Sequence, residues 1–101
     1  MGRRKVSRYV PRWIKQHIAK RERREALRKR DGDNCWRCHR PMRFGPPFNV
    51  GKAATIEHKV PQSANGTDDL ENLVLCHVGC NRYLGANSPE QKERMRLRPA
   101  R

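Results

Sequence analysis

The pattern of hydrophobic and polar residues divides the chain into a charged first third, a more apolar middle and a charged end. Residues 13–30 contain no Pro or Gly, and Ala, Arg, Lys, Glu and Gln dominate there. This composition predicts a helix that begins after Pro11 and ends at the sequence DGDN. Its apolar stripe is thin and consists of Trp13, Ile14, Ile18, Ala26 and Leu27.

Two short apolar runs in the middle of the chain predict strands. The sequence ATIEHKV, residues 54–60, and the sequence NLVLC, residues 72–76, are rich in β-branched and aliphatic side chains. A long turn rich in Asn, Gly and Asp separates them, so we expect an antiparallel hairpin.

Two short helices are predicted after the hairpin. Residues 77–86 form a candidate helix that Gly85 ends, and the sequence SPEQ, residues 88–91, is a capping box with Pro at the first helical position. A basic helix over residues 89–97 follows. The predicted fold class is therefore small α+β.

Size and composition limit how much of the chain can be compact. The chain has 101 residues, of which 35% are hydrophobic, and the mean hydropathy is −1.09. Such a small domain usually needs a metal or disulfide to stabilise it. We expect a basic N-terminal arm and helix over residues 1–31, a compact core over 32–86, and a basic C-terminal helix and tail over 87–101.

The charge points to a polyanionic partner. The formal net charge is +14, and 13 of the 24 Lys and Arg residues lie within residues 1–31. This favours a nucleic acid over a membrane surface, because the apolar face of the predicted helix is narrow. A solvated charged helix without a ligand is the alternative. The candidate DNA contacts are Arg21, Arg24, Arg28, Lys29, Arg30, Lys59 and Arg82.

The four cysteines form two close pairs. Without a signal peptide or a long apolar run, we expect a cytoplasmic location, where paired thiols more often bind metal than form disulfides. The predicted ligands of a structural Zn²⁺ are Cys35, Cys38, Cys76 and Cys80. His39 and His77 each lie next to a cysteine and could replace one, although a surface histidine is the simpler interpretation of both.

The zinc site would bring four polar side chains into one small region: Glu57, His58, Asn72 and Asn81. Carboxylate and amide oxygens suit Mg²⁺ or Mn²⁺ better than zinc. A histidine suits proton transfer near neutral pH. Neighbouring residues on a regular strand point to opposite faces, so Glu57 and His58 share one site only if the strand end is twisted or bulged.

The sequence EHKVPQSANGTDDLENLVLCHVGCN, with the upstream ALRKRDGDNCWRC, resembles the zinc-containing branch of the HNH endonucleases over about residues 26–85. The resemblance implies a ββα-metal motif on a treble-clef-like zinc knuckle. It also implies that His58 is the general base, that Glu57 and Asn81 bind one divalent metal, and that Asn72 pins the loop that aims His58. Such enzymes hydrolyse DNA phosphodiesters, one strand per site, and leave 5′-phosphate and 3′-hydroxyl ends.

This chain departs from the family pattern in three places. Asn81 stands where the family often has His, and the second Cys pair is one residue longer than usual. Tyr83 and Leu84 stand where a Lys is frequent, which leaves Arg82 as the expected local phosphate contact. A non-catalytic zinc module that binds DNA or RNA is the alternative function. The chain could act as a homodimer or within a larger nuclease or viral assembly. Its residues are equally compatible with a role in a mobile element, a restriction system or a virus, and a protein of a virus or mobile element would act in the host cytoplasm.

Overall fold

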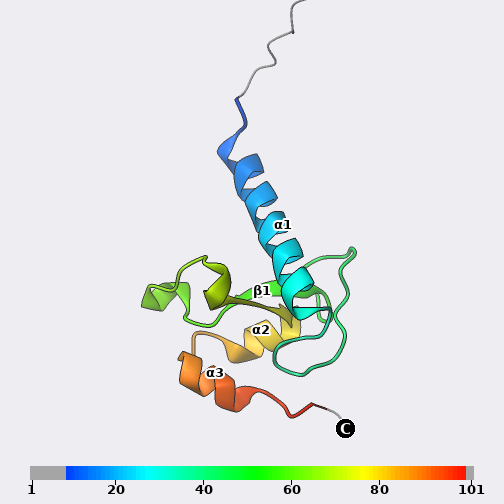
Figure 1. Ribbon diagram of the computed structural model, residues 1–101, viewed down its shortest axis with the longest axis vertical. Helices are drawn as coiled ribbons and strands as arrows, with labels where there is room; N and C mark the ends of the chain where they lie inside the picture. The colour runs from blue at the N-terminus through cyan, green and yellow to red at the C-terminus, as the bar shows by residue number, and fades with distance from the viewer. Residues whose placement is uncertain (1–8, 100–101) are drawn as a thin grey trace, which may run out of the picture.

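The computed structural model describes residues 9–99 and has the expected small α+β fold (Figure 1). Residues 1–8 of the predicted arm and residues 100–101 of the predicted tail lie outside the described residues. The elements are α1 (Arg12–Asp31), β1 (Ala54–His58), β2 (Leu73–His77), α2 (Val78–Leu84) and α3 (Pro89–Met95), with short 3₁₀ turns η1 (Gln62–Ala64) and η2 (Leu70–Asn72) between the strands.

Helix α1 has the predicted bounds to within one residue, and its first half extends away from the rest of the molecule (Figure 1). Gly32 ends it with a φ of 83° and donates its N–H to the carbonyl of Arg28, a backbone conformation that glycine adopts without strain. The side chain of Leu27 is fully buried. The guanidinium of Arg30 donates to the carbonyls of Leu70 and Leu73, so the end of α1 is fixed to the start of β2.

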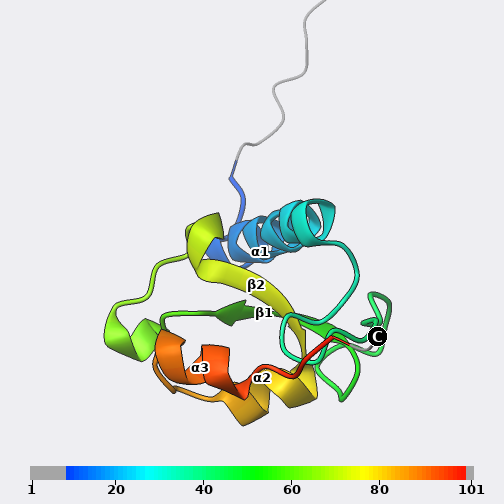
Figure 2. The same cartoon turned by 60° about the horizontal axis from the view of Figure 1, so that its bottom comes forward.

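The two strands form the predicted antiparallel hairpin, in a register that pairs Ala54 with His77 and His58 with Leu73. Figure 2 shows the hairpin between α1 on one side and α2 and α3 on the other. All residues of β2 are buried because helices cover both of its faces. The core consists of Leu27, Cys35, Met42, Ala54, Leu73, Val74, Leu75, Cys76 and Leu84.

Helix α3 begins with the predicted capping box, in which Ser88 and Gln91 exchange side-chain and backbone hydrogen bonds. It ends at Met95, two residues earlier than predicted, because the chain then turns back to the cysteine-bearing segment. There the N–H of Leu97 donates to the carbonyl of Arg37, and the guanidinium of Arg96 donates to the carbonyl of Trp36. Within residues 9–99, no helix is both long and apolar enough to cross a membrane.

Candidate metal centres and active site

Four soft donor groups meet where the chain before the hairpin contacts the junction of β2 and α2. The cluster consists of Cys35, Cys38, His77 and Cys80, and their ligand atoms all lie within 4.8 Å of one another. The Sγ atom of Cys38 is 3.2 Å from Nδ1 of His77. Three thiolates and one imidazole are a donor set that suits tetrahedral Zn²⁺, so this cluster is a candidate structural zinc site.

The groups around this cluster orient its ligands. Nε2 of His77 lies 2.9 Å from the carbonyl of Pro41 and donates its hydrogen to it, which leaves the lone pair on Nδ1 facing the sulfur atoms. The backbone N–H of His77 donates to Sγ of Cys35 at 3.4 Å, and the guanidinium of Arg37 donates to Sγ of Cys80 at 3.7 Å. Such donors stabilise thiolates, as a zinc site requires.

The cluster differs from the predicted set because His77 takes the place of Cys76. Cys76 is fully buried in the core, opposite Thr55 in the hairpin. A hydrogen bond to Cys35 raises the pKa of the Cys76 thiol far above its ordinary value, so Cys76 is a neutral donor behind the cluster. The interpretation of His77 as a surface residue is wrong. The two-residue gap from His77 to Cys80 repeats the gap from Cys35 to Cys38, and this signal in the sequence was missed.

Asn72 fixes the loop between the strands. Its Oδ1 accepts from the N–H of Val60 at 2.8 Å, and its Nδ2 donates to the carbonyls of Val60 and Thr67 at 3.1 and 2.9 Å. Gly66 lies so close to the chain that an added Cβ would stand 1.8 Å from the carbonyl oxygen of Val60. The loop is therefore tightly closed behind His58, as a pinning asparagine would require.

The ring of His58 is directed into this loop. Its Nε2 lies 2.8 Å from Oδ1 of Asp68, and the other carboxylate oxygen of Asp68 is 3.9 Å from the guanidinium of Arg23 on α1. The hydrogen bond from His58 lowers the pKa of Asp68, so this carboxylate is ionised near neutral pH. Asp68 was not predicted, because the sequence shows it as one polar residue in a polar turn.

The carboxylate of Glu57 is buried against α3. Glu57 is 5% exposed, and its Oε1 lies 3.0 Å from Nζ of Lys92, a lysine that is 1% exposed. The same ammonium donates to the carbonyl of His58 at 2.6 Å. Burial raises the pKa of Glu57, and the ammonium of Lys92 opposes that change. Lys92 was also missed, because it resembles its exposed neighbours in a basic helix.

Glu57 and His58 therefore point to different neighbours, as strand alternation requires. The first side chain contacts α3, whereas the second contacts the loop that lies towards α1, and these helices flank the hairpin on opposite sides (Figure 2). Strand β1 has no twist or bulge that would place Glu57 and His58 on one face. Their side chains therefore lie on opposite sides of the strand end.

Glu57 and Asn81, the residues expected to hold a divalent metal, provide part of the set of oxygen ligands that such an ion needs. Oε2 of Glu57 is buried and has no hydrogen-bond partner among the described residues, so a lone carboxylate oxygen remains for a cation. Nδ2 of Asn81 donates to the carbonyl of Ile56 at 3.1 Å, which places its amide beside the residue before Glu57. This bond uses the nitrogen of Asn81, while the carbonyl oxygen is the atom that Mg²⁺ prefers. The donor chemistry fits Mg²⁺ or Mn²⁺.

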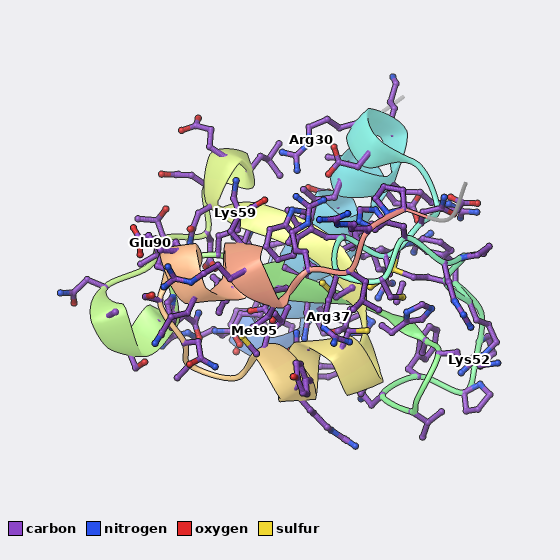
Figure 3. The ribbon with its side chains drawn as sticks, turned by 90° about the horizontal axis from the view of Figure 1, so that it is seen from below. Arg30, Arg37, Lys52, Lys59, Glu90 and Met95 are labelled. Carbon is purple, nitrogen blue, oxygen red and sulfur yellow. The ribbon has the colours of Figure 1, made fainter. Side chains whose placement is uncertain are left out.

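The predicted DNA contacts lie in different surroundings. Arg28 bonds Asp33 at 2.7 Å and stacks over Phe44 at 3.9 Å, so part of its role is structural. Arg30 and Lys59, labelled in Figure 3, line one groove of about 600 Å³ with Arg96. Arg24 lies over the ring of Phe48 at 5.7 Å. The remaining three are exposed side chains: Arg21, Lys29 and Arg82.

Comparison with known families identifies the class of protein. The profile of the HNH endonucleases matches residues 35–87, which is more than half of the chain. The chain therefore belongs to the HNH endonuclease family, and its membership indicates a nuclease. Searches of curated proteins and of solved structures gave no significant match.

Proposed function

We propose that this protein is a metal-dependent endonuclease that hydrolyses phosphodiester bonds in double-stranded DNA. The proposal rests on the family match together with two contacts at the end of β1: Asn72 closes the loop behind His58, and Asn81 bonds the strand beside Glu57. One such site nicks one strand and leaves 5′-phosphate and 3′-hydroxyl ends. Cutting both strands would need a second copy or a partner.

His58 is the general base of the proposed reaction. The ring of His58 takes a proton from the attacking water. The support for this role is the position of His58 at the end of β1, where Asp68 holds one of its ring nitrogens. Asn72 acts through position, because its three hydrogen bonds fix the loop that the ring contacts.

Glu57 and Asn81 would hold the catalytic Mg²⁺ or Mn²⁺ through a carboxylate and an amide oxygen. A bound divalent ion stabilises the negative charge that develops on the phosphate and on the leaving oxygen. The zinc cluster has no role in the chemistry under this proposal. It holds the segment before the hairpin against the start of α2, and α2 carries Asn81.

The basic surface supplies affinity for the duplex. Lysine and arginine contacts to phosphates release counterions and weaken as salt is added. Arg30 and Lys59 share a groove beside the end of β1, and the exposed cations of α1 extend the positive surface away from the site. We place the DNA backbone along these two regions.

The test is nicking of supercoiled plasmid by protein purified with bound zinc. Wild type should nick the plasmid when Mg²⁺ or Mn²⁺ is added and should not nick it when neither ion is added. Omitting the ion is preferable to adding a chelator, because a chelator would also remove the zinc. His58→Ala should abolish nicking and retain the gel shift of a labelled duplex. His17→Ala, which removes an exposed histidine from α1, is the matched control and should nick like wild type.

One observation favours the second candidate, a zinc module that binds DNA or RNA without cutting. The carboxylate of Glu57 is buried and already carries the ammonium of Lys92, an arrangement that a purely structural ion pair would also show. Under this alternative, wild type binds nucleic acid but nicks with neither ion, and His58→Ala behaves the same way.

A further inference from the structure

The loop between the strands places one carboxylate against the proposed general base. Oδ1 of Asp68 lies 2.8 Å from Nε2 of His58, which is the distance of a charge-assisted hydrogen bond. A neutral imidazole has one N–H donor and one nitrogen with a lone pair. Since a carboxylate accepts hydrogen bonds, Nε2 must carry the hydrogen, and Nδ1 then keeps the lone pair.

From this geometry we infer that Asp68 is a positioning residue, which holds the His58 ring with Nε2–H bound so that Nδ1 receives the proton from water. The inference deepens the proposed function and rests on it for the role of His58. An aspartate that orients a histidine in this way fixes both the tautomer and the ring angle, and it stabilises the imidazolium that forms.

The surroundings of Asp68 fit a held carboxylate better than a free surface one. Two hydrogen bonds hold the loop closed: Nδ2 of Asn72 donates to the carbonyl of Thr67, and the N–H of Gly66 donates to the carbonyl of Pro61. The close approach of Gly66 to Val60 restricts it further. Asp68 therefore keeps its place across from His58 by the fold of the loop, and its half-exposed position leaves it ionised.

The neighbouring Asp69 provides a matched control. The carboxylate of Asp69 accepts a hydrogen bond from the hydroxyl of Thr67 at 3.1 Å. Asp69→Ala therefore removes the same charge from the same loop without removing a partner of His58. A third variant, Arg23→Gln, tests whether any effect of Asp68 passes through its 3.9 Å contact with α1 instead of through His58.

Two measurements test the inference. In nicking assays with Mg²⁺, Asp68→Ala should lower kcat by about 10- to 100-fold with KM nearly unchanged, the usual effect of losing a partner of this kind. Asp68→Asn, which keeps an oxygen acceptor, should fall between Asp68→Ala and wild type. Asp69→Ala should stay within about twofold of wild type, because Asp68 is the residue that contacts the ring. Arg23→Gln removes a cation of α1, so we expect it to raise KM and to keep kcat within about twofold of wild type.

The second measurement does not depend on activity. In ¹H–¹⁵N spectra of the histidine rings, wild type and Asp69→Ala should show a slowly exchanging Nε2–H of His58, and Asp68→Ala should lose it. A signal on Nδ1 of wild type, or an Nε2–H signal that survives in Asp68→Ala, would overturn the inference, as would a loss of kcat shared by Asp69→Ala. If wild type fails to nick, the proposed function fails, and the ring spectra still decide whether Asp68 holds His58.

Discussion

The substitution Lys92→Met is the most informative test of what stabilises this fold. Lys92 and Glu57 form an ion pair 3.0 Å apart with side chains that are 1% and 6% exposed, so neither charge has water to replace its partner. Methionine keeps the length of the side chain and removes its charge. Breaking a buried pair from one side costs about 3–5 kcal/mol, out of about 5–15 kcal/mol for the unfolding of a domain of this size.

The pH dependence of that loss follows from Glu57. Burial already raises the folded-state pKa of Glu57 above the unfolded value of about 4.3, and with Lys92 gone no ammonium opposes burial, so this pKa rises further. A carboxyl with a raised folded-state pKa stabilises the fold at low pH, and that stability is lost as pH rises towards the folded pKa. Each pKa unit between the folded and the unfolded value is worth about 1.4 kcal/mol, so the deficit of the variant grows as pH rises through that window.

The assay is urea unfolding followed by tryptophan fluorescence at a fixed zinc concentration, at pH 6.5 and 7.5. The free-energy deficit of Lys92→Met relative to wild type should be smaller at the lower pH, by at most about 1.4 kcal/mol for one proton. Arg94→Met removes an exposed cation from the same helix and is the control. Glu57→Gln combined with Lys92→Met should recover most of the loss and show no such pH effect. A Lys92→Met deficit no larger than that of Arg94→Met would refute the reasoning.

Three further predictions follow from the loop, the zinc cluster and the charge. Cys76→Ala should retain one zinc per chain after dialysis, whereas His77→Ala should lose it, as measured by atomic absorption. The opposite result, zinc lost in Cys76→Ala and retained in His77→Ala, would restore the four-cysteine set. Gly66→Ala should lower the unfolding free energy by about 1–3 kcal/mol, because the new methyl group clashes with Val60. The control is Gly45→Ala, which should change the unfolding free energy little, because its new methyl group meets no atom within 4 Å. Duplex affinity, measured by fluorescence anisotropy, should fall at least about 10³-fold between 50 and 200 mM salt if six or more phosphates are contacted; a flat response would argue against phosphate binding.

The elements could be predicted because local signals determine them. Pro11 and Gly32 bound α1, and the capping box of Ser88 and Gln91 starts α3. The hairpin follows from two short apolar runs around a polar turn. Each of these signals acts within a few residues of its effect, so a single sequence contains it in full.

The partners within the site could not be predicted, because they depend on where distant segments meet. Cys76 and His77 are neighbours in the sequence, and the register of β2 alone decides which of them enters the core and which joins the cysteines. Lys92 is separated from Glu57 by 35 residues, and its burial results from the way α3 crosses the end of β1. Asp68 and Asp69 are alike in sequence, and the closure of the loop selects the first as the partner of His58.

The zinc cluster and the proposed catalytic pair are connected through the C-terminal segment. Arg37, between the first two cysteines, accepts from the N–H of Leu97 at 2.8 Å and donates to the carbonyl of Met95 at 3.1 Å. These bonds fix the end of α3, and one turn earlier Lys92 bonds both Glu57 and the carbonyl of His58. A metal bound by Cys35 and Cys38, on either side of Arg37, would therefore also hold α3 in place. If these bonds were lost, the buried carboxylate of Glu57 would lose the helix that supplies its counter-charge. A metal in the candidate zinc site would therefore stabilise the end of β1 as well as the cysteine-bearing segment.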